Sequence, residues 1–344
     1  MSLEIVPVPA PPDGERSSLY DGWHATYLAA ELHGREDTAT AWQHDEVRVD
    51  VLADDDSRTI ELWAGLDGGE VVAAGYLELP QRDNRDHAWM AVHVHPDHRR
   101  RGHGSALLEH LTERARAAGR TLLDGEVGWA HDLGPDGAGV PGVEFLQRHG
   151  WSNALGDVQR VLDLPVDGAL LDRLAAEAAP YHTAYTLRAF VGPVPDELLE
   201  GWAALVGQLV VEAPMGDLQL EAEDVDPALV RVKEETVRRQ GRTKYSAVAL
   251  DADGTVVAYT DLATTVHEPG RAYQWGTLVH RDHRGHRLGV AVKVANLRLL
   301  QAERPDVTRL ITYNAEVNEH MVAVNVALGF RPVERLGEFS RTLA

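Results

Sequence analysis

The residues best suited to chemistry form a short basic segment, VHPDHRRRGHGS, at residues 94–105. Within it, three consecutive arginines precede two glycines and a serine, at the point where a helical pattern begins. An anion bound at a helix N-terminus needs free backbone N–H groups, small residues that allow close approach, and cations nearby. The segment supplies all three and predicts a diphosphate site, although a solvated arginine cluster on a glycine-rich turn would have the same sequence. The predicted contacts are Arg99, Arg100, Arg101, Gly102, His103, Gly104 and Ser105.

This basic segment occurs twice in the chain. VHPDHR at residues 94–99 aligns with VHRDHR at residues 279–284, an offset of 279 − 94 = 185 residues. An internal duplication is the simplest explanation. In the second copy Arg287 replaces the first glycine, which puts tight binding of an anion there in doubt. The predicted contacts that remain are Arg284, Gly285, Leu288 and Gly289.

The elements expected around the two segments repeat in the same order. Each copy is predicted to contain a β-hairpin, a strand, the basic loop, an amphipathic helix, a second strand and a helix that ends at a Gly-aromatic pair. In the first copy these elements fall at 58–80, 88–95, 105–118, 121–127 and 143–149, followed by a strand at 158–164; in the second they fall at 246–262, 273–280, 290–303, 310–313 and 319–328. We therefore expect an N-terminal domain at 1–165, a linker helix at 166–183 and a C-terminal domain at 184–344.

Two other phosphate-binding motifs fit the sequence poorly. A Walker loop requires G-x-x-x-x-G-K-[ST], and no such run occurs. A dinucleotide fingerprint requires G-x-G-x-x-G directly after a strand. Here Leu107 occupies the third glycine position, and a polar, arginine-rich loop separates the strand from Gly102.

Arg99-x-x-Gly102-x-Gly104, preceded by Val94-x-Pro96, resembles motif A of the GCN5-related N-acetyltransferase (GNAT) superfamily. The resemblance covers nearly the whole chain as two tandem copies, an arrangement similar to that of mycothiol-synthase-like members. It implies an α/β (α+β) fold of two GNAT domains. Each would be a mixed, mostly antiparallel sheet flanked by helices, with its fourth and fifth strands splayed apart.

The resemblance also implies a co-substrate and a reaction. Acetyl-CoA would bind between the splayed strands, with its diphosphate on the basic loop and its pantetheine along the backbone near Val94 or Val279 and beside Asn318. An acceptor amine would attack the thioester directly, while a base removes the ammonium proton and backbone N–H groups polarise the carbonyl. We expect acetyl-CoA in the N-terminal copy, because of its loop, and the acceptor-selecting and catalytic groups in the C-terminal copy.

No residue stands out as the catalytic base. Family members often carry a glutamate six residues before the valine, where this chain has Ala88 and Tyr273. The candidates are Tyr273 and a water held by Thr277 or Asn314, with Tyr273 and Thr277 expected on one face of their strand.

The other candidate acids and bases are weaker. Glu126 lies on the fifth strand of the N-terminal copy and Glu316 follows that of the C-terminal copy, and solvated surface carboxylates would look the same. The tyrosine that often protonates the departing thiolate is replaced by Leu146 in one copy and Asn325 in the other, and an amide cannot act as an acid.

The net charge and the acidic residues limit the classes of ligand that the chain is expected to bind. Lys plus Arg is 33 and Asp plus Glu is 54, so the net charge of 33 − 54 = −21 disfavours bulk binding to nucleic acid or anionic membranes. An acidic segment at 212–227 would form an acidic, partly apolar mouth for an amine, although a solvated loop fits equally well. Its predicted substrate contacts are Met215, Asp217 and Glu221.

The chain has no cysteine, which excludes a disulfide, a thiolate zinc site and a cysteine nucleophile. His93, His95 and His98 are spaced poorly for a metal, and no carboxylate except Asp97 completes a ligand set, so no metal is predicted. The sequence has no signal-like N-terminus and no run of roughly 20 apolar residues. We therefore expect a cytoplasmic protein, as a monomer or homodimer.

Together these features predict an N-acetyltransferase that moves acetyl from acetyl-CoA to a primary amine of a small molecule. A non-catalytic acyl-CoA-binding or sensor protein is the alternative, because both copies lack the family's usual glutamate and tyrosine. A protein-lysine acetyltransferase is a third reading. Release of free CoA in the presence of mixed amines separates the first reading from the second.

Overall fold

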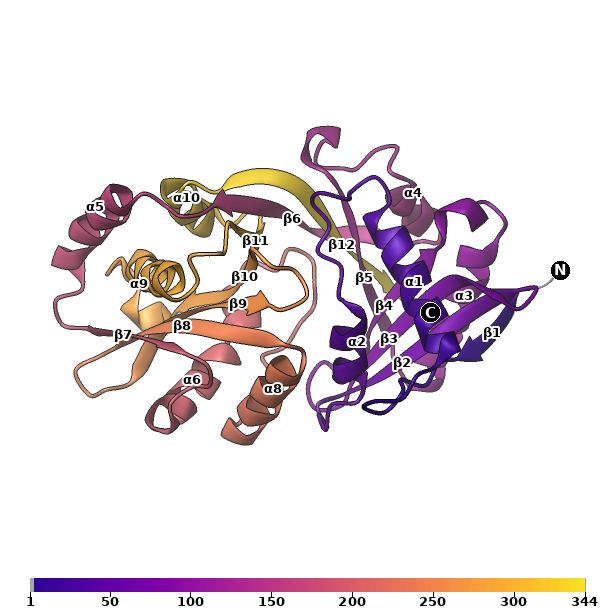
Figure 1. The fold of residues 1–344 in the computed structure, drawn as a ribbon, viewed down its shortest axis with the longest axis horizontal. Coiled ribbons are helices and arrows are strands. Elements are labelled where there is room, and N and C mark those ends of the chain that lie inside the picture. Colours follow the sequence, from indigo (N-terminus) through magenta and orange to yellow (C-terminus); the bar gives the residue numbers. More distant parts are fainter. Residues whose placement is uncertain (1–2, 344) are drawn as a thin grey trace. The chain divides into compact units, whose positions relative to one another are not determined.

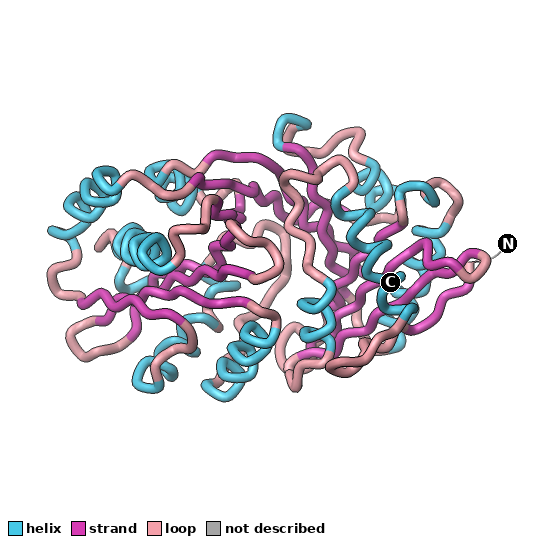
Figure 2. The backbone as a smooth tube through the Cα atoms, viewed as in Figure 1, coloured by secondary structure: helices cyan, strands magenta, loops and turns pink. Residues whose placement is uncertain are grey.

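The structure is a computed structural model that describes residues 3–343. Contacts within the chain divide it into two compact units. Unit 1 combines Met1–Gly156 with Glu334–Ala344, and unit 2 is Asp157–Val333. Both units are built from strands and helices, as Figure 2 shows.

Unit 1 is a sheet with strand order β1-β2-β3-β4-β5-β12 and helices on both faces. Its strands are β1 (Glu4–Pro7), β2 (Arg58–Asp67), β3 (Glu70–Pro80), β4 (His87–Val94), β5 (Leu122–Ala130) and β12 (Arg331–Thr342). Its helices are α1 (Ser18–Leu32), α2 (His44–Val51), α3 (His103–Ala117) and α4 (Pro141–Arg148), with short 3-10 turns η1 (Pro96–His98) and η2 (His131–Leu133). Every pairing is antiparallel except that of β4 with β5.

Strands β4 and β5 separate soon after they begin. They pair in parallel where His87–Trp89 meets Leu122–Asp124, and among the described residues they do not pair beyond this point. Within this paired stretch the imidazole Nδ1 of His87 lies 2.6 Å from Asp124 Oδ2, and both side chains are buried. A Cβ on Gly125 would lie 2.8 Å from the Met90 carbonyl oxygen, so only glycine allows this close approach. The splay that the resemblance implies is therefore present in unit 1.

Unit 2 is a sheet with strand order β6-β11-β10-β9-β8-β7. Its strands are β6 (Ser152–Asp163), β7 (Thr186–Val191), β8 (Arg242–Leu250), β9 (Val256–Thr265), β10 (Arg271–Val279) and β11 (Arg309–Ala315). Its helices are α5 (Gly168–Ala178), α6 (Leu199–Val206), α7 (Leu209–Glu212), α8 (Pro227–Arg239), α9 (Leu288–Glu303) and α10 (Glu319–Leu328), with 3-10 turns η3 (Ala179–Tyr181), η4 (Asp196–Leu198) and η5 (Arg281–His283).

The splay is repeated in unit 2. In the described part of the chain, strands β10 and β11 pair in parallel where residues 271–274 meet residues 309–312 and nowhere else. Beyond that point β10 continues against β9, with a β-bulge between Gln274 and Thr277. A bulge inserts one extra residue and therefore reverses the faces on which the following side chains lie.

The last strands of the two copies are exchanged between the units. Strand β6, which the sequence assigns to the N-terminal copy, pairs with β11 of unit 2 from Asp163↔Arg309 to Asp157↔Ala315. Strand β12 pairs with β5 of unit 1, and in Figure 1 the yellow β12 runs beside the purple β5. The continuous ranges 1–165 and 184–344 therefore divide the chain differently from its contacts. Residues 157–165 pack with the second unit and residues 334–343 with the first.

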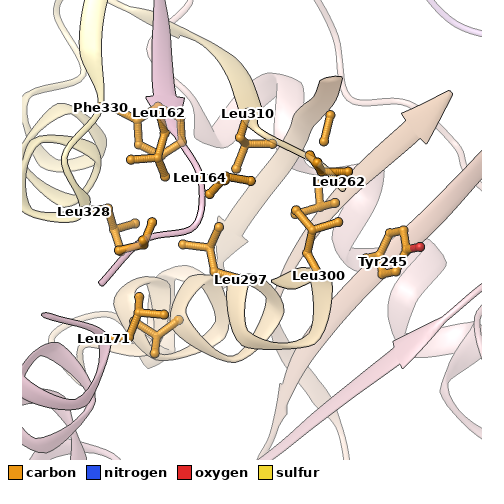
Figure 3. Packing of buried hydrophobic residues seen from close by; sticks show 14 of the residues in the cluster. Leu162, Leu164, Leu171, Tyr245, Leu262, Leu297, Leu300, Leu310, Leu328 and Phe330 are labelled. Carbon is orange, nitrogen blue, oxygen red and sulfur yellow. The ribbon is translucent and has the colours of Figure 1, made fainter. Parts of the chain in front are cut away.

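Each unit has its own apolar core. In unit 1, leucines of α3 pack with Leu77, Leu123 and Phe339 from the sheet. In unit 2, α9 packs against β8 and β9 and against α5, the helix predicted as a linker. Figure 3 shows Leu297 and Leu300 of α9 pointing toward Leu162 on β6 and Leu310 on β11.

Candidate functional site

The basic loop of unit 1 connects β4 to α3 through two residues with left-handed backbone. Arg100 has φ 65° and Gly102 has φ 87°. Helix α3 begins at His103, two residues earlier than its predicted start. The first intrahelical hydrogen bond runs from Ala106 N to Gly102 O at 3.1 Å, so the N–H groups of residues 103–105 precede it. These are the free donors that an anion at a helix N-terminus requires.

The arginines of this loop carry uncompensated positive charge. Arg100 and Arg101 are exposed, and within residues 3–343 neither has a carboxylate within ion-pair distance. Arg101 donates to the Asp97 carbonyl oxygen at 3.1 Å. In a chain of net charge −21, this loop is a local concentration of positive charge.

Arg99, the first residue of the motif, binds the protein itself. Its Nε donates to the Val94 carbonyl at 3.2 Å, and its Nη2 donates to the Ala30 carbonyl of α1 at 3.3 Å. Burial lowers the pKa of this guanidinium. Arg284 repeats the first contact, with its Nε 3.4 Å from the Val279 carbonyl. This arginine therefore fixes the start of the loop in both copies.

The small residues of the first helical turn allow tight packing. A Cβ on Gly104 would meet side-chain atoms of Val94 and Phe145 at 3.4 Å. The hydroxyl of Ser105 lies 3.0 Å from Nε2 of His149, the residue that follows α4. Together these contacts hold the start of α3 against β4 and α4.

The loop of unit 2 has the same backbone with the glycine moved. Gly285 has φ 85° at the position of Arg100, and Arg287 has φ 53° at the position of Gly102. Each copy therefore has one glycine and one arginine at the two left-handed positions. Arg287 therefore leaves the path of the backbone unchanged. Whether the second loop can bind an anion depends instead on the charges around it.

Acidic side chains neutralise the second loop. Glu212 of α7 forms an ion pair with Arg281, whose Nε lies 3.0 Å away, and accepts a hydrogen bond from Arg284 Nη2 at 2.7 Å. Arg287 lies 4.9 Å from the ring centroid of Tyr181 and 4.0 Å from a carboxylate oxygen of Glu177. The carboxylate of Glu212 thus occupies the arginines that an incoming anion would need.

The predicted acidic mouth lies in the loop after α7. Asp217 and Glu221 are exposed and Met215 is half-buried there. Glu212, at the start of this segment, has a side chain that is only 10% exposed. Asn318 caps α10, because its Oδ1 accepts from the N–H of Met321 at 3.1 Å.

The three catalytic candidates of the C-terminal copy are engaged in other contacts. Tyr273 is 8% exposed, and its hydroxyl donates to a carboxylate oxygen of Glu268. Burial and this carboxylate raise the pKa of Tyr273, which disfavours a role as proton acceptor. Thr277 bonds the Thr260 hydroxyl at 2.7 Å, and because of the bulge it lies on the face opposite Tyr273, contrary to the expected alternation.

Asn314 belongs to a buried amide network. Its Oδ1 accepts from Asn325 Nδ2 at 2.8 Å and from Arg160 Nη1 at 3.3 Å. Asn325 is completely buried. The asparagine pair therefore links β11 to α10.

One polar cluster in unit 1 was missed by reasoning from sequence. His93 of β4 lies beside Glu31 of α1, with Nε2 and Oε2 3.4 Å apart, and its ring meets that of Tyr27 edge-on at 4.9 Å. Arg35 forms ion pairs with both Glu31 and Glu334 of β12, and its Nη2 lies 2.7 Å from Glu334 Oε2. The sequence shows His93 only as part of a histidine-rich segment, and nothing in it indicates that α1 lies opposite.

The histidines of the loops have a structural role. Nδ1 of His95 accepts from the N–H of Asp97, and Nδ1 of His280 accepts from the N–H of Asp282, so each caps a 3-10 turn. Across the described part of the chain, no group of three or more His, Asp or Glu side chains is arranged to hold a metal ion. Over the same residues, no helix is both long and apolar enough to cross a membrane.

Comparison with known proteins agrees with this geometry. The profile of the acetyltransferase (GNAT) family matches residues 18–127. A tandem GNAT protein from the clavulanic acid biosynthesis pathway, solved without acetyl-CoA, has 31% identity and a TM-score of 0.76, with 99% of this chain and 98% of that chain covered. A mycothiol acetyltransferase of Sanguibacter keddieii is 28% identical over 247 residues, 70% of each chain. A GCN5-related N-acetyltransferase from Sphaerobacter thermophilus, 15% identical with a TM-score of 0.62 and covering 98% of this chain and 95% of that one, shares the fold.

Two splayed sheets, each with a basic loop at a helix N-terminus, define an acyltransferase of tandem architecture. The chain belongs to the GCN5-related N-acetyltransferase family. Members of this family use acetyl-CoA as co-substrate for acetyl transfer.

Proposed function

We propose that this chain transfers the acetyl group of acetyl-CoA to a primary amine of a small molecule, and that unit 1 binds the acetyl-CoA. The observation that carries this assignment is the difference between the two loops. Arg100 and Arg101 are exposed and lack acidic partners among residues 3–343, whereas Arg281 and Arg284 are bound by Glu212. A diphosphate gains charge-assisted hydrogen bonds at the first loop without having to displace a carboxylate.

The proposed position of the co-substrate follows the splay. The diphosphate would lie on the N–H groups of residues 103–105. The pantetheine would run along the edge of β4 that β5 leaves unpaired, near Val94. There the amine nitrogen would attack the thioester carbon directly, and backbone N–H groups would stabilise the developing oxyanion.

The acceptor class is supported by the relatives and by charge. Several relatives are mycothiol acetyltransferases, whose name indicates a small-molecule substrate. The net charge of −21 attracts cations, including protonated amines.

Calorimetric titration of acetyl-CoA tests the assignment. The first variant carries Arg100→Gln with Arg101→Gln, and the matched control carries Arg284→Gln with Arg287→Gln. We expect the first variant to lose at least about tenfold in affinity, since a hydrogen bond to a charged group contributes about 1.5–3 kcal/mol. The control should bind as the wild type does. The reverse pattern would move the co-substrate to unit 2, and binding without CoA release from any amine would favour the non-catalytic reading.

A further inference from the structure

The proposed reaction needs a group that accepts a proton from the acceptor's ammonium, and one strand edge in unit 1 offers such a group. Past its last pairing with β5, β4 turns alternate side chains to opposite faces. The side chains toward α3 and α4 join the apolar core there; they are Met90, Val92 and Val94. Ala91 and His93 point the other way, toward α1. His93 is thus the titratable side chain on the splayed stretch of β4.

The geometry of His93 leaves one ring nitrogen available. Its Nε2 lies 3.4 Å from Oε2 of Glu31, and the two side chains are 18% and 28% exposed, so a small ligand can reach them. With the Nε2 proton directed at this carboxylate, the neutral imidazole keeps its lone pair on Nδ1. Nδ1 accepts no hydrogen bond from any residue of the described range 3–343.

Glu31 is held as a carboxylate. Burial alone would raise its pKa, but the contact with His93 and the charge of Arg35 lower the pKa of this carboxyl. Arg35 Nη1 lies 3.5 Å from Glu31 Oε1. Through its contact with the Ala30 carbonyl, Arg99 joins the basic loop to the same turn of α1. The anion loop and the His93–Glu31 pair are therefore parts of one assembly.

The second unit has no counterpart of this pair. The residue aligned with His93 is 93 + 185 = 278, a leucine. Leu278 is 6% exposed and packs in an apolar cluster with Trp202 and Tyr259. The fold therefore does not require a polar pair at this position, and unit 1 alone combines it with a loop free of acidic partners.

We propose that His93 accepts the proton of the acceptor amine and that Glu31 is its positioning residue, whose carboxylate also favours a cationic acceptor. This inference rests on the proposed function. An ammonium proton passes to Nδ1 of His93, and the freed nitrogen attacks the thioester carbon. The C–N bond forms, the C–S bond breaks, and the thiolate leaves with the electron pair. The thiolate takes the second N–H proton, and His93 returns its proton to water.

Other charged groups around His93 enter its pH dependence. Tyr27 and Glu31 face it from α1, and Arg35 follows that helix. Strand β3 places Ala74 opposite it. The neighbouring charges on the basic loop and on β5 are Arg99, Asp124, which is bound to His87, and Glu126.

The test compares wild type, His93→Gln, Glu31→Gln and the control His110→Gln. His110 is a half-buried histidine on α3 that packs against Trp63, away from the loop. CoA release from acetyl-CoA is measured with spermidine, 2-phenylethylamine and glucosamine across neutral pH, and acetyl-CoA affinity is measured by calorimetry. Acetyl-CoA affinity should be the same in all four proteins, which also shows that the variants are folded.

We expect His93→Gln to lower kcat/KM by about 100- to 1,000-fold and to abolish the acidic limb of its pH profile. Glu31→Gln should lower kcat/KM most for spermidine, because the cationic acceptor loses a carboxylate, and His110→Gln should match the wild type. An active wild type whose rate and limb survive both substitutions would overturn the inference alone. A wild type that binds acetyl-CoA but releases no CoA with any of the three amines would refute the proposed acetyl transfer, and the inference with it. A wild type that does not bind acetyl-CoA would refute the proposed function at its first step.

Discussion

A buried lysine on α9 makes the stability of unit 2 depend on pH. Lys293 is 2% exposed, and its Nζ lies 5.9 Å from the ring centroid of Phe330. Among residues 3–343 it has no carboxylate within ion-pair distance. Desolvation lowers its pKa from 10.5 to about 7. The aligned residue in unit 1, 293 − 185 = 108, is Leu108, which is 3% exposed.

The magnitude follows from linkage. Between pH 7 and pH 10 the unfolded chain holds a proton on Lys293 that the folded chain releases, so stability increases with pH in this window and decreases as pH falls through it. Each pH unit changes the free energy of unfolding by about 1.4 kcal/mol. The full shift, from 10.5 to about 7, corresponds to about 5 kcal/mol. Lys293→Leu should remove this dependence and stabilise the protein most at pH 7.

Urea unfolding of the wild type and Lys293→Leu at pH 7, 8 and 9 measures the effect. We expect the advantage of the variant to shrink by about 2 kcal/mol between pH 7 and pH 9. Lys233→Leu is the control, because Lys233 is 46% exposed beside Glu223 and its charge is solvated when folded. An advantage of Lys293→Leu that stays constant over this range would refute the reasoning.

Three further predictions concern other parts of the structure. Glu212→Gln frees the two arginines it binds, so calorimetry should detect a second, weaker acetyl-CoA site; unchanged stoichiometry would show that another feature closes that loop. Gly125→Ala places a Cβ 2.8 Å from the Met90 carbonyl, so thermal unfolding should show a loss of about 1–3 kcal/mol, and an unchanged Tm would contradict the tight approach at the splay. Burial raises the pKa of Asp157 to about 6, so ionising this carboxyl destabilises the folded state. The free energy of unfolding therefore falls as pH rises from about 4 to 6. Asp157→Asn should therefore stabilise above pH 6 but not below pH 4 in pH-dependent unfolding, and equal effects at both ends would contradict this.

The sequence by itself determined the repeated architecture and the position of the anion loop. Periodicity located the strands and helices, and the family resemblance supplied the splay. Two copies of a strand, a basic loop and a helix are local features, because glycine positions, arginine clusters and apolar periodicity depend on neighbours in the chain. The assignment of acetyl-CoA to the N-terminal loop also came from these local features of the sequence. It stays a proposal.

Only the tertiary structure decided which groups meet. The strands after Gly150-Trp151 and Gly329-Phe330 are equivalent in pattern, so periodicity could not show that β6 and β12 are exchanged. A single bulge in β10 separated Thr277 from Tyr273, because one extra residue reverses the alternation of faces. Glu212 binds Arg284 of the second loop although 72 residues separate the two in sequence, and Glu31 contacts His93 from α1, near the start of the chain. Such contacts depend on how elements pack, and packing is set by the whole core rather than by any local run of residues.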